Sequence, residues 1–403
     1  MENIKKVFKS QVPSILVAMG HGGTHWVNAA IYLLLPYITL DLGLSYTQAG
    51  LIMTVFLTST FASNAVSGPL VDIAGNGRYA RFQAYALAIG GFALLLMSIA
   101  SSIYMLFISV MLMGVSISLW HPAAITYLSV RYPESRGFVL SVHSIGASLG
   151  DALSPLLGAA LLTYMAWNST SAILSVPLFI LMIIILVFLK DGPIDKKPII
   201  KQEDKDKDSY IDSLRILLKN MQLIPLFLVA GVRTLTQNGI LVFMPLYLVT
   251  NQGLSPAVMG SSLFIMQIGG LFSGPIAGVL SDKYGRKIIA IISLMISAIL
   301  VPFYIIINSH ILIVILSGII GFAIYAGRPV VQGWALDISS EKTSGSVISL
   351  LFMVQVGSAG IFTIIAGFIA DIYGIEIIFI ILSLICITAL TIASFIPSKI
   401  IKS

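Results

Sequence analysis

The sequence contains very little charge. Asp, Glu, Lys and Arg make up only 10% of its 403 residues, whereas about a quarter of an ordinary soluble domain is charged. So few charged side chains cannot cover the surface of a soluble protein of this length, and hydrophobic residues reach 57%. The composition therefore excludes a soluble globular protein and predicts a polytopic membrane protein.

Cysteine is nearly absent as well. Cys386 is the single cysteine and lies in an apolar run, which excludes an intramolecular disulfide. The phosphate-binding pattern G-x-x-x-x-G-K-[ST] is also missing, so ATP hydrolysis is excluded as an energy source. We expect no cofactor and no resident metal, and the sequence does not predict an enzyme.

Long apolar runs, in contrast, fill the chain. Each run is close to the 20 or so residues that a membrane-spanning helix needs, and a spanning segment must satisfy its own backbone hydrogen bonds. The runs cover residues 12–40, 46–71, 79–100, 103–130, 137–164, 170–189, 221–250, 256–280, 287–307, 311–336, 345–370 and 375–396. We predict an all-α membrane protein of twelve transmembrane helices. Residues 1–190 and 221–403 form two six-helix bundles, joined by a charged linker, 191–220, that ends in an amphipathic helix.

Apart from Arg233 and Arg328, which lie inside spans, the basic residues are confined to alternate connections. Those connections include the N-terminus, the linker and the C-terminus, whereas the intervening loops carry no Lys or Arg. Positive residues mark the cytoplasmic side of membrane proteins, so we expect both termini to be cytoplasmic in a cell membrane. The net charge of +6 thus reflects orientation in a lipid bilayer, and no nucleic-acid partner is expected.

The two halves repeat one another. Residues 43–50 match 253–260, and residues 68–72 match 278–282, both at an offset of 210. Internal repeats of this kind are typical of secondary transporters, in which the site lies between two halves.

One repeated loop carries a specific motif. The run Gly278-Val-Leu-Ser-Asp-Lys-Tyr-Gly-Arg-Lys287 resembles the loop motif of the major facilitator superfamily, and the resemblance extends over essentially the whole chain. It implies a transporter with two pseudo-symmetric bundles, alternating access, a monomeric state and a latch between helices. The residues implied in the latch are Gly278, Asp282, Gly285, Arg286 and Lys287, with Gly68 and Asp72 in a degraded first copy that lacks the paired cations.

A second motif lies in the fifth span. Gly146, Gly150, Ser154, Pro155 and Gly158 resemble the antiporter motif of the same superfamily, with Ser154 in place of a glycine. Small residues four apart let two helices approach closely. The motif implies drug–proton exchange, and together with His121-Pro122 it is most similar to the fosmidomycin-resistance branch.

Polar residues inside the spans are the candidates for function, because they are costly in a bilayer. In the superfamily that the chain resembles, spans 1, 4, 7 and 10 line the cavity. The candidate substrate-binding residues on these spans are His21, His25, Asn28, Tyr32, Trp120, His121, Arg233, Gln237, Tyr325, Arg328 and Gln332.

The two arginines decide the expected charge of the substrate. Arg233 and Arg328 keep their protons, so each needs an anion, either a carboxylate of the protein or a substrate group. Asp151 is the one clear carboxylate deep in a span, which leaves one cation in excess and favours an anionic substrate. A permanently paired, architectural arginine is the alternative, above all for Arg233.

Proton coupling is expected from Asp151, His143 and His121. Histidine titrates near neutral pH, and Asp151 and His143 are eight residues apart on one helical face. The alternative for Asp151 is a locked ion pair in a helix interface.

We therefore predict proton-coupled export of a small organic anion. Uptake by proton symport, or exchange of one anion for another, needs the same residues and stays open. A carrier of transition metals or cationic drugs is a further alternative, since His21 and His25 at i, i+4 with His121 supply nitrogen ligands. The two arginines argue against it because they repel cations.

Overall fold

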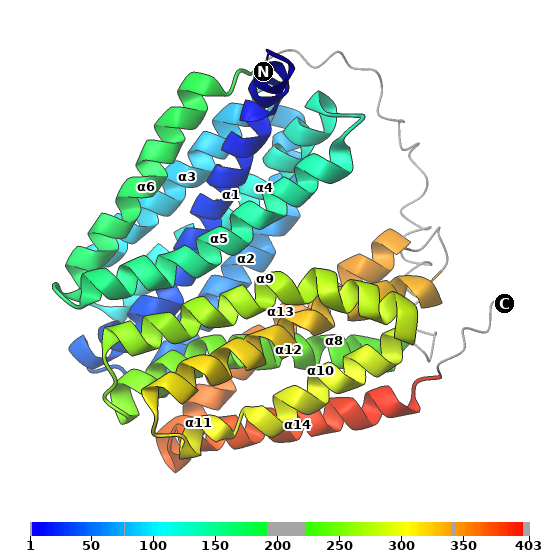
Figure 1. The fold of residues 1–403 in the computed structure, drawn as a ribbon. Helices are drawn as coiled ribbons and strands as arrows, with labels where there is room; N and C mark the ends of the chain where they lie inside the picture. Colours follow the sequence, from blue (N-terminus) through cyan, green and yellow to red (C-terminus); the bar gives the residue numbers. More distant parts are fainter. Residues whose placement is uncertain (1, 76, 192–222, 340–343, 398–403) are drawn as a thin grey trace. The chain divides into compact units, whose positions relative to one another are not determined.

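The computed structural model of the chain describes residues 2–75, 77–191, 223–339 and 344–397 (Figure 1). These residues form helices and short connections, and none of them belongs to a β-strand. The predicted all-α membrane architecture is confirmed. The predicted linker and its amphipathic helix lie almost entirely outside the described residues, so the division into domains at residues 190 and 220 stays a prediction.

The first six helices follow the first six apolar runs. We call them the first bundle. They are α1 (Glu2–Asp41), α2 (Tyr46–Gly75), α3 (Tyr79–Ser98), α4 (Ile103–Arg131), α5 (Arg136–Leu162) and α6 (Trp167–Phe188).

The remaining described helices form the second bundle. They are α8 (Leu223–Leu246), the π-helical turn η1 (Tyr247–Asn251), α9 (Pro256–Tyr284), α10 (Arg286–Leu300), α11 (Phe303–Ile306), α12 (His310–Ile338), α13 (Ser344–Tyr373) and α14 (Glu376–Phe395). The sequence predicts one span over 287–307, but the structure divides it into α10 and α11. Pro302 lies at the break, where it removes a backbone N–H and ends the α-helical ladder.

Eleven helical segments of the described chain are long and apolar enough to cross a membrane. The 40-residue helix α1 is not among them. Its middle contains Gly20-His-Gly-Gly-Thr-His25. These six consecutive residues have no large apolar side chain, which lowers the hydropathy of the helix, and they include the candidate site residues His21 and His25.

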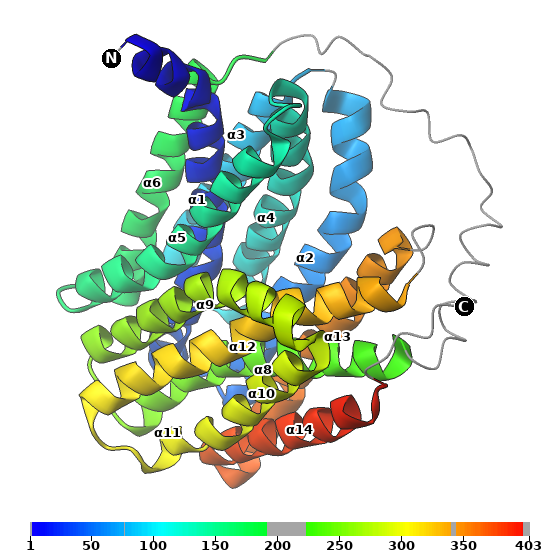
Figure 2. The same cartoon turned by 45° about the vertical axis from the view of Figure 1, so that its right-hand side comes forward.

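The sequence repeat is visible in the packing of each bundle. In the first bundle α1 packs against α5, and α3 packs against α4 and α6 (Figures 1 and 2). In the second bundle α8 packs against α13, and α10 packs against α12 and α14. Each of these three pairings has its repeat counterpart in the other bundle. Backbone contacts divide the chain into two units, residues 1–195 with 248–264 and residues 196–247 with 265–403.

The antiporter-like motif forms the contact between α5 and α1. Its residues face α1 at steps of four: Gly146 against Ala18, Gly150 against Gly22, Ser154 against Trp26 and Gly158 against Leu33. A Cβ atom added to Gly146 or Gly150 would collide with a backbone carbonyl oxygen of α1, and the Ser154 hydroxyl donates to the Trp26 carbonyl at 2.9 Å. This close seam sets the register of the two helices that carry most of the buried histidines.

Candidate functional site

Four histidines meet inside the first bundle. His21 and His25 come from α1, His121 from α4 and His143 from α5. The ring of His21 stacks on that of His143 with centroids 3.7 Å apart, and lies edge-on to His25 at 4.7 Å and to His121 at 5.0 Å. His21 and His143 are buried, at 5% and 4% exposure, so the cluster is built into the helix packing.

Backbone carbonyls fix the position of the ring proton on two of these histidines. His21 Nδ1 lies 2.8 Å from the His143 carbonyl oxygen, and His121 Nδ1 lies 2.8 Å from the Ile117 carbonyl oxygen. A carbonyl oxygen only accepts, so each Nδ1 carries the hydrogen and donates it. The Nε2 atoms of His21 and His121 then face each other at 3.3 Å.

His143 is oriented by a tryptophan. The fully buried Trp120 donates its indole N–H to His143 Nε2 at 3.2 Å, and its ring fills the space beside Gly20, where a Cβ atom would collide with it. Trp120 therefore packs α4 against α1 and holds the ring of His143.

The carboxylate of Asp151 pairs with a histidine. Its Oδ2 atom lies 2.8 Å from His25 Nδ1, and the two side chains are 20% and 24% exposed. The other oxygen, Oδ1, is buried and has no hydrogen-bond partner within the described structure. Further along the same helix as His25, Asn28 is half-buried and Tyr32 is buried.

The second bundle places an arginine in its interior. Arg233 on α8 is 5% exposed, and it donates to the Gln237 side-chain oxygen at 2.8 Å and to the Thr234 hydroxyl at 2.6 Å. Its Nε atom has no partner, and no carboxylate of the described residues lies within 4.0 Å of its guanidinium. The interior charge is thus hydrogen-bonded but not neutralised.

A second cation on α12 adds to this charge. Arg328 is exposed and lies near enough to Arg233 to repel it, while Tyr325, one turn earlier, also interacts with Arg233. Gly327 lets the helices meet here, since a Cβ atom at this position would lie 3.0 Å from Arg233 Cδ. Gln332 is half-buried one turn beyond Arg328.

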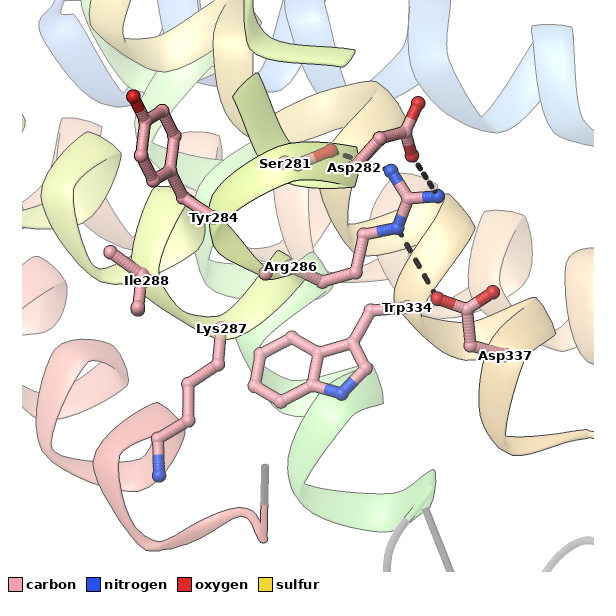
Figure 3. A pocket seen from close by; sticks show the side chains of 9 residues that line it. Ser281, Asp282, Tyr284, Arg286, Lys287, Ile288, Trp334 and Asp337 are labelled. Carbon is pink, nitrogen blue, oxygen red and sulfur yellow. Dashed lines mark hydrogen bonds and ion pairs between the residues drawn. The ribbon is translucent and has the colours of Figure 1, made fainter. Parts of the chain in front are cut away.

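The loop motif between α9 and α10 is held by an ion network (Figure 3). Arg286 pairs with Asp282 at 2.6 Å and with Asp337 of α12 at 3.2 Å, and it donates to the Ser281 hydroxyl at 2.5 Å. Lys287 donates to the carbonyl oxygens of Ser394 and Ile396 at the end of α14. These contacts surround a cavity of about 320 Å³ that Trp334 also lines.

Gly285 turns the chain between the two helices. Its φ of +98° lies in the left-handed region, which favours glycine. Gly278 has open space where a Cβ atom would lie, and so has Gly68 in the first copy.

The first copy of the motif uses a residue that the sequence did not reveal. Asp191, just after α6, accepts the backbone N–H of Ala80 at 2.8 Å and pairs with Arg81 at 3.2 Å, whereas Asp72 is exposed. Asp191 looked like the first residue of a solvated linker. Asp337, which pairs with Arg286, is likewise absent from the candidate residues that the sequence indicates.

Comparisons with known proteins define the class. The sequence matches the profile of the Major Facilitator Superfamily over residues 17–255 and 226–399, and the chain belongs to that family of transporters. It is therefore a multi-pass membrane transporter of small molecules.

Several individual transporters are similar to this chain in sequence or in structure. The multidrug resistance protein MdtG of Salmonella schwarzengrund (strain CVM19633) is 26% identical over 343 residues, which are 81% of each chain. The solved structure of the nucleoside transporter NupG superposes with a TM-score of 0.81 at 12% identity, covering 96% of this chain and 99% of that one. The structure of a bacterial homologue of the human lysosomal transporter Spinster superposes with a TM-score of 0.79 at 14% identity, covering 95% of this chain and 96% of that one. These structures share the fold.

Proposed function

We propose that the protein exports a small organic anion by alternating access, driven by an inward flow of protons. The observation that carries the proposal is the guanidinium of Arg233, which is buried with an unpaired Nε and has no carboxylate within 4.0 Å among the described residues.

An uncompensated charge in the interior of a membrane protein is costly. Arg328 raises this cost, because it repels Arg233 from the neighbouring helix. A substrate carboxylate would offset one of the two guanidinium charges and a doubly charged phosphate or phosphonate both, and each can accept paired hydrogen bonds from the arginines. Gln237, Gln332 and Tyr325 would supply further polar contacts.

Export is supported by the relationship to MdtG, which is described as a multidrug resistance protein. The antiporter-like motif, which forms the seam between α1 and α5, also favours export, because the motif that it resembles implies drug–proton exchange. Proton-driven uptake and anion exchange would use the same residues, so direction is part of the proposal.

For coupling we propose Asp151 together with the histidines that surround it. Asp151 contacts His25 at 2.8 Å and is the carboxylate nearest to the histidine cluster, so a proton that enters the cluster changes the charge of the first bundle. We further propose that the protein works as a monomer with both termini in the cytoplasm.

A binding screen on the purified protein tests the charge of the substrate. Phosphonates, carboxylates, sugar phosphates and organic cations are compared by the thermal shift they produce in detergent. A ligand at a hundredfold excess over its Kd stabilises the folded state by about 2.7 kcal/mol. We expect an organic anion to stabilise the protein and Arg328→Gln to abolish that shift.

The exposed arginine Arg136 at the start of α5 supplies the control, since Arg136→Gln should leave the shift intact. Stabilisation by cations alone, or an anion shift that survives Arg328→Gln, would contradict the proposal.

A further inference from the structure

The histidine cluster has a feature that the proposed function does not require. Three of its rings, His21, His25 and His121, each offer one nitrogen, and these three nitrogens lie within 4.8 Å of one another. We propose that they form a binding site for a divalent first-row transition metal ion, with Zn²⁺ as the principal ligand.

The tautomers of two rings leave nitrogens available as ligands. His21 and His121 both donate their Nδ1 hydrogen to a backbone carbonyl oxygen, so in the neutral rings both Nε2 atoms carry a lone pair. The two Nε2 atoms lie 3.3 Å apart. In the neutral rings neither nitrogen can donate to the other, so the contact becomes favourable when the pair binds a proton or a metal ion.

The distance between the Nε2 atoms of His21 and His121 fits a shared metal ion. Two nitrogens bound to one tetrahedral Zn²⁺ at about 2.0–2.1 Å lie about 3.3–3.4 Å apart. The observed separation of the Nε2 atoms of His21 and His121 is 3.3 Å. One edge of a coordination tetrahedron is therefore already formed, and only His25 has to move closer.

The hydrogen-bond partners of the three Nδ1 atoms are also those of a metal site. Metal-binding histidines donate their second ring N–H to a carbonyl or a carboxylate, which fixes the tautomer and strengthens the ligand. Here the three Nδ1 atoms lie 2.8 Å from the His143 carbonyl, the Ile117 carbonyl and the Asp151 carboxylate. The cluster thus has the outer hydrogen bonds of a metal site, including a negative charge beside His25.

His143 belongs to this outer set. Its Nε2 atom accepts the indole N–H of Trp120, and its ring stacks on His21, so its lone pair is already used. Three nitrogen ligands leave a fourth tetrahedral position for water or another small ligand. The proposal concerns binding in the first bundle and does not depend on the charge of the transported solute.

The test uses full-length protein in detergent, purified without a polyhistidine tag. Zn²⁺ binding is measured by calorimetry, and Co²⁺ serves as a spectroscopic probe because its visible absorption distinguishes tetrahedral from octahedral coordination. We expect one ion per chain with a tetrahedral Co²⁺ spectrum. His121→Ala and His25→Ala should each weaken binding by more than the 10–100-fold expected for Asp151→Asn, which removes only an outer hydrogen-bond partner.

His310 at the exposed start of α12 gives the matched control, since His310→Ala should bind as the wild type does. His121→Cys keeps a ligand at this position and should add a sulfur-to-cobalt charge-transfer band that the wild type lacks, which remains informative if His121→Ala does not fold. Absence of Zn²⁺ and Co²⁺ binding, or binding that both histidine-to-alanine variants retain, would overturn the proposal. These measurements involve no transport, so their failure is distinct from a failure of the proposed export.

Discussion

The two bundles share one arrangement of helices but differ in the polar side chains that they carry. In the first bundle, α1, α4 and α5 bring together four histidines and the carboxylate of Asp151. In the second bundle, the corresponding α8 and α12 carry Arg233 and Arg328, with no carboxylate within 4.0 Å of Arg233 among the residues described. The first bundle thus gathers histidine and carboxylate side chains, whereas the second gathers arginines, which keep their protons. The repeat therefore sets the scaffold, and under the proposed function the first bundle serves proton coupling and the second serves substrate binding.

The bundles also differ in how tightly their equivalent helices pack. In the first bundle Gly150 faces the backbone of Gly22, whereas in the second bundle Gly231 of α8 faces the side chains of Val354 and Ser358 on α13. The nearest atom to an added Cβ at Gly231 is Val354 Cγ1 at 3.1 Å. A side chain can shift where a backbone carbonyl cannot, so the α1–α5 seam is the less tolerant one.

The largest expected difference in stability is between two glycine-to-alanine substitutions, one in the α1–α5 contact and one in the α8–α13 contact. Gly150→Ala should destabilise the protein by about 3 kcal/mol or more, because the backbone of α1 has to move. Gly231→Ala should cost no more than about 1 kcal/mol. Size-exclusion profiles and thermal unfolding in detergent measure both, and equal tolerance at the two positions would show that the seams do not differ.

A smaller effect is expected from the two arginines at the loops. Arg286 contacts two carboxylates and a hydroxyl, with 26% of its side chain exposed, whereas Arg81 contacts Asp191 and is 57% exposed. Exposed ion pairs contribute about 0.2–1 kcal/mol each, so Arg286→Gln should lower stability by about 1 kcal/mol and Arg81→Gln by less than about 0.5 kcal/mol. The thermal unfolding midpoints report the order, and a larger loss for Arg81→Gln would reverse the comparison.

The smallest effect concerns how the helix ends are held. Asp191 accepts the Ala80 N–H at the start of α3, whereas Lys287 of α10 donates to carbonyls at the end of α14. Each charge complements a helix terminus, which is worth about 0.3–1 kcal/mol and is weakened by salt. Asp191→Asn and Lys287→Gln should therefore cost a few tenths of a kcal/mol each, less at high ionic strength. A loss that does not depend on salt would point to packing instead of charge.

Much of this scaffold is predictable from the sequence, because continuous apolar runs define membrane helices directly. The run 311–336 became α12 (His310–Ile338), whereas the run 287–307 is broken at Pro302 and the run 221–250 ends in the π-helical turn η1. The glycine spacing of α5 also predicted a close helix contact. That spacing did not indicate which helix packs there, because a small-residue seam fits any partner that has small residues at the same steps.

The site was less predictable, since it depends on register between helices. The sequence placed His21 and His25 on one face of α1 and predicted an arginine as a possible partner of Asp151. It could not predict that Asp151 would contact His25, or that His21 would donate to the backbone carbonyl of His143. Such contacts follow from the position of α5 along α1. The packing of Gly146 and Gly150 fixes that position, and no pattern of polar residues in the sequence indicates it.

The most direct test of the account is transport into inverted proteoliposomes under an imposed pH gradient. Using the organic anion selected by the binding screen, we predict that a gradient acid inside the vesicle drives accumulation of the anion. Arg328→Gln should abolish accumulation by removing binding, and Asp151→Asn should retain binding but lose the response to the gradient. Accumulation that ignores the pH gradient in the wild type, or that Asp151→Asn still couples to it, would contradict the division of roles between the two bundles.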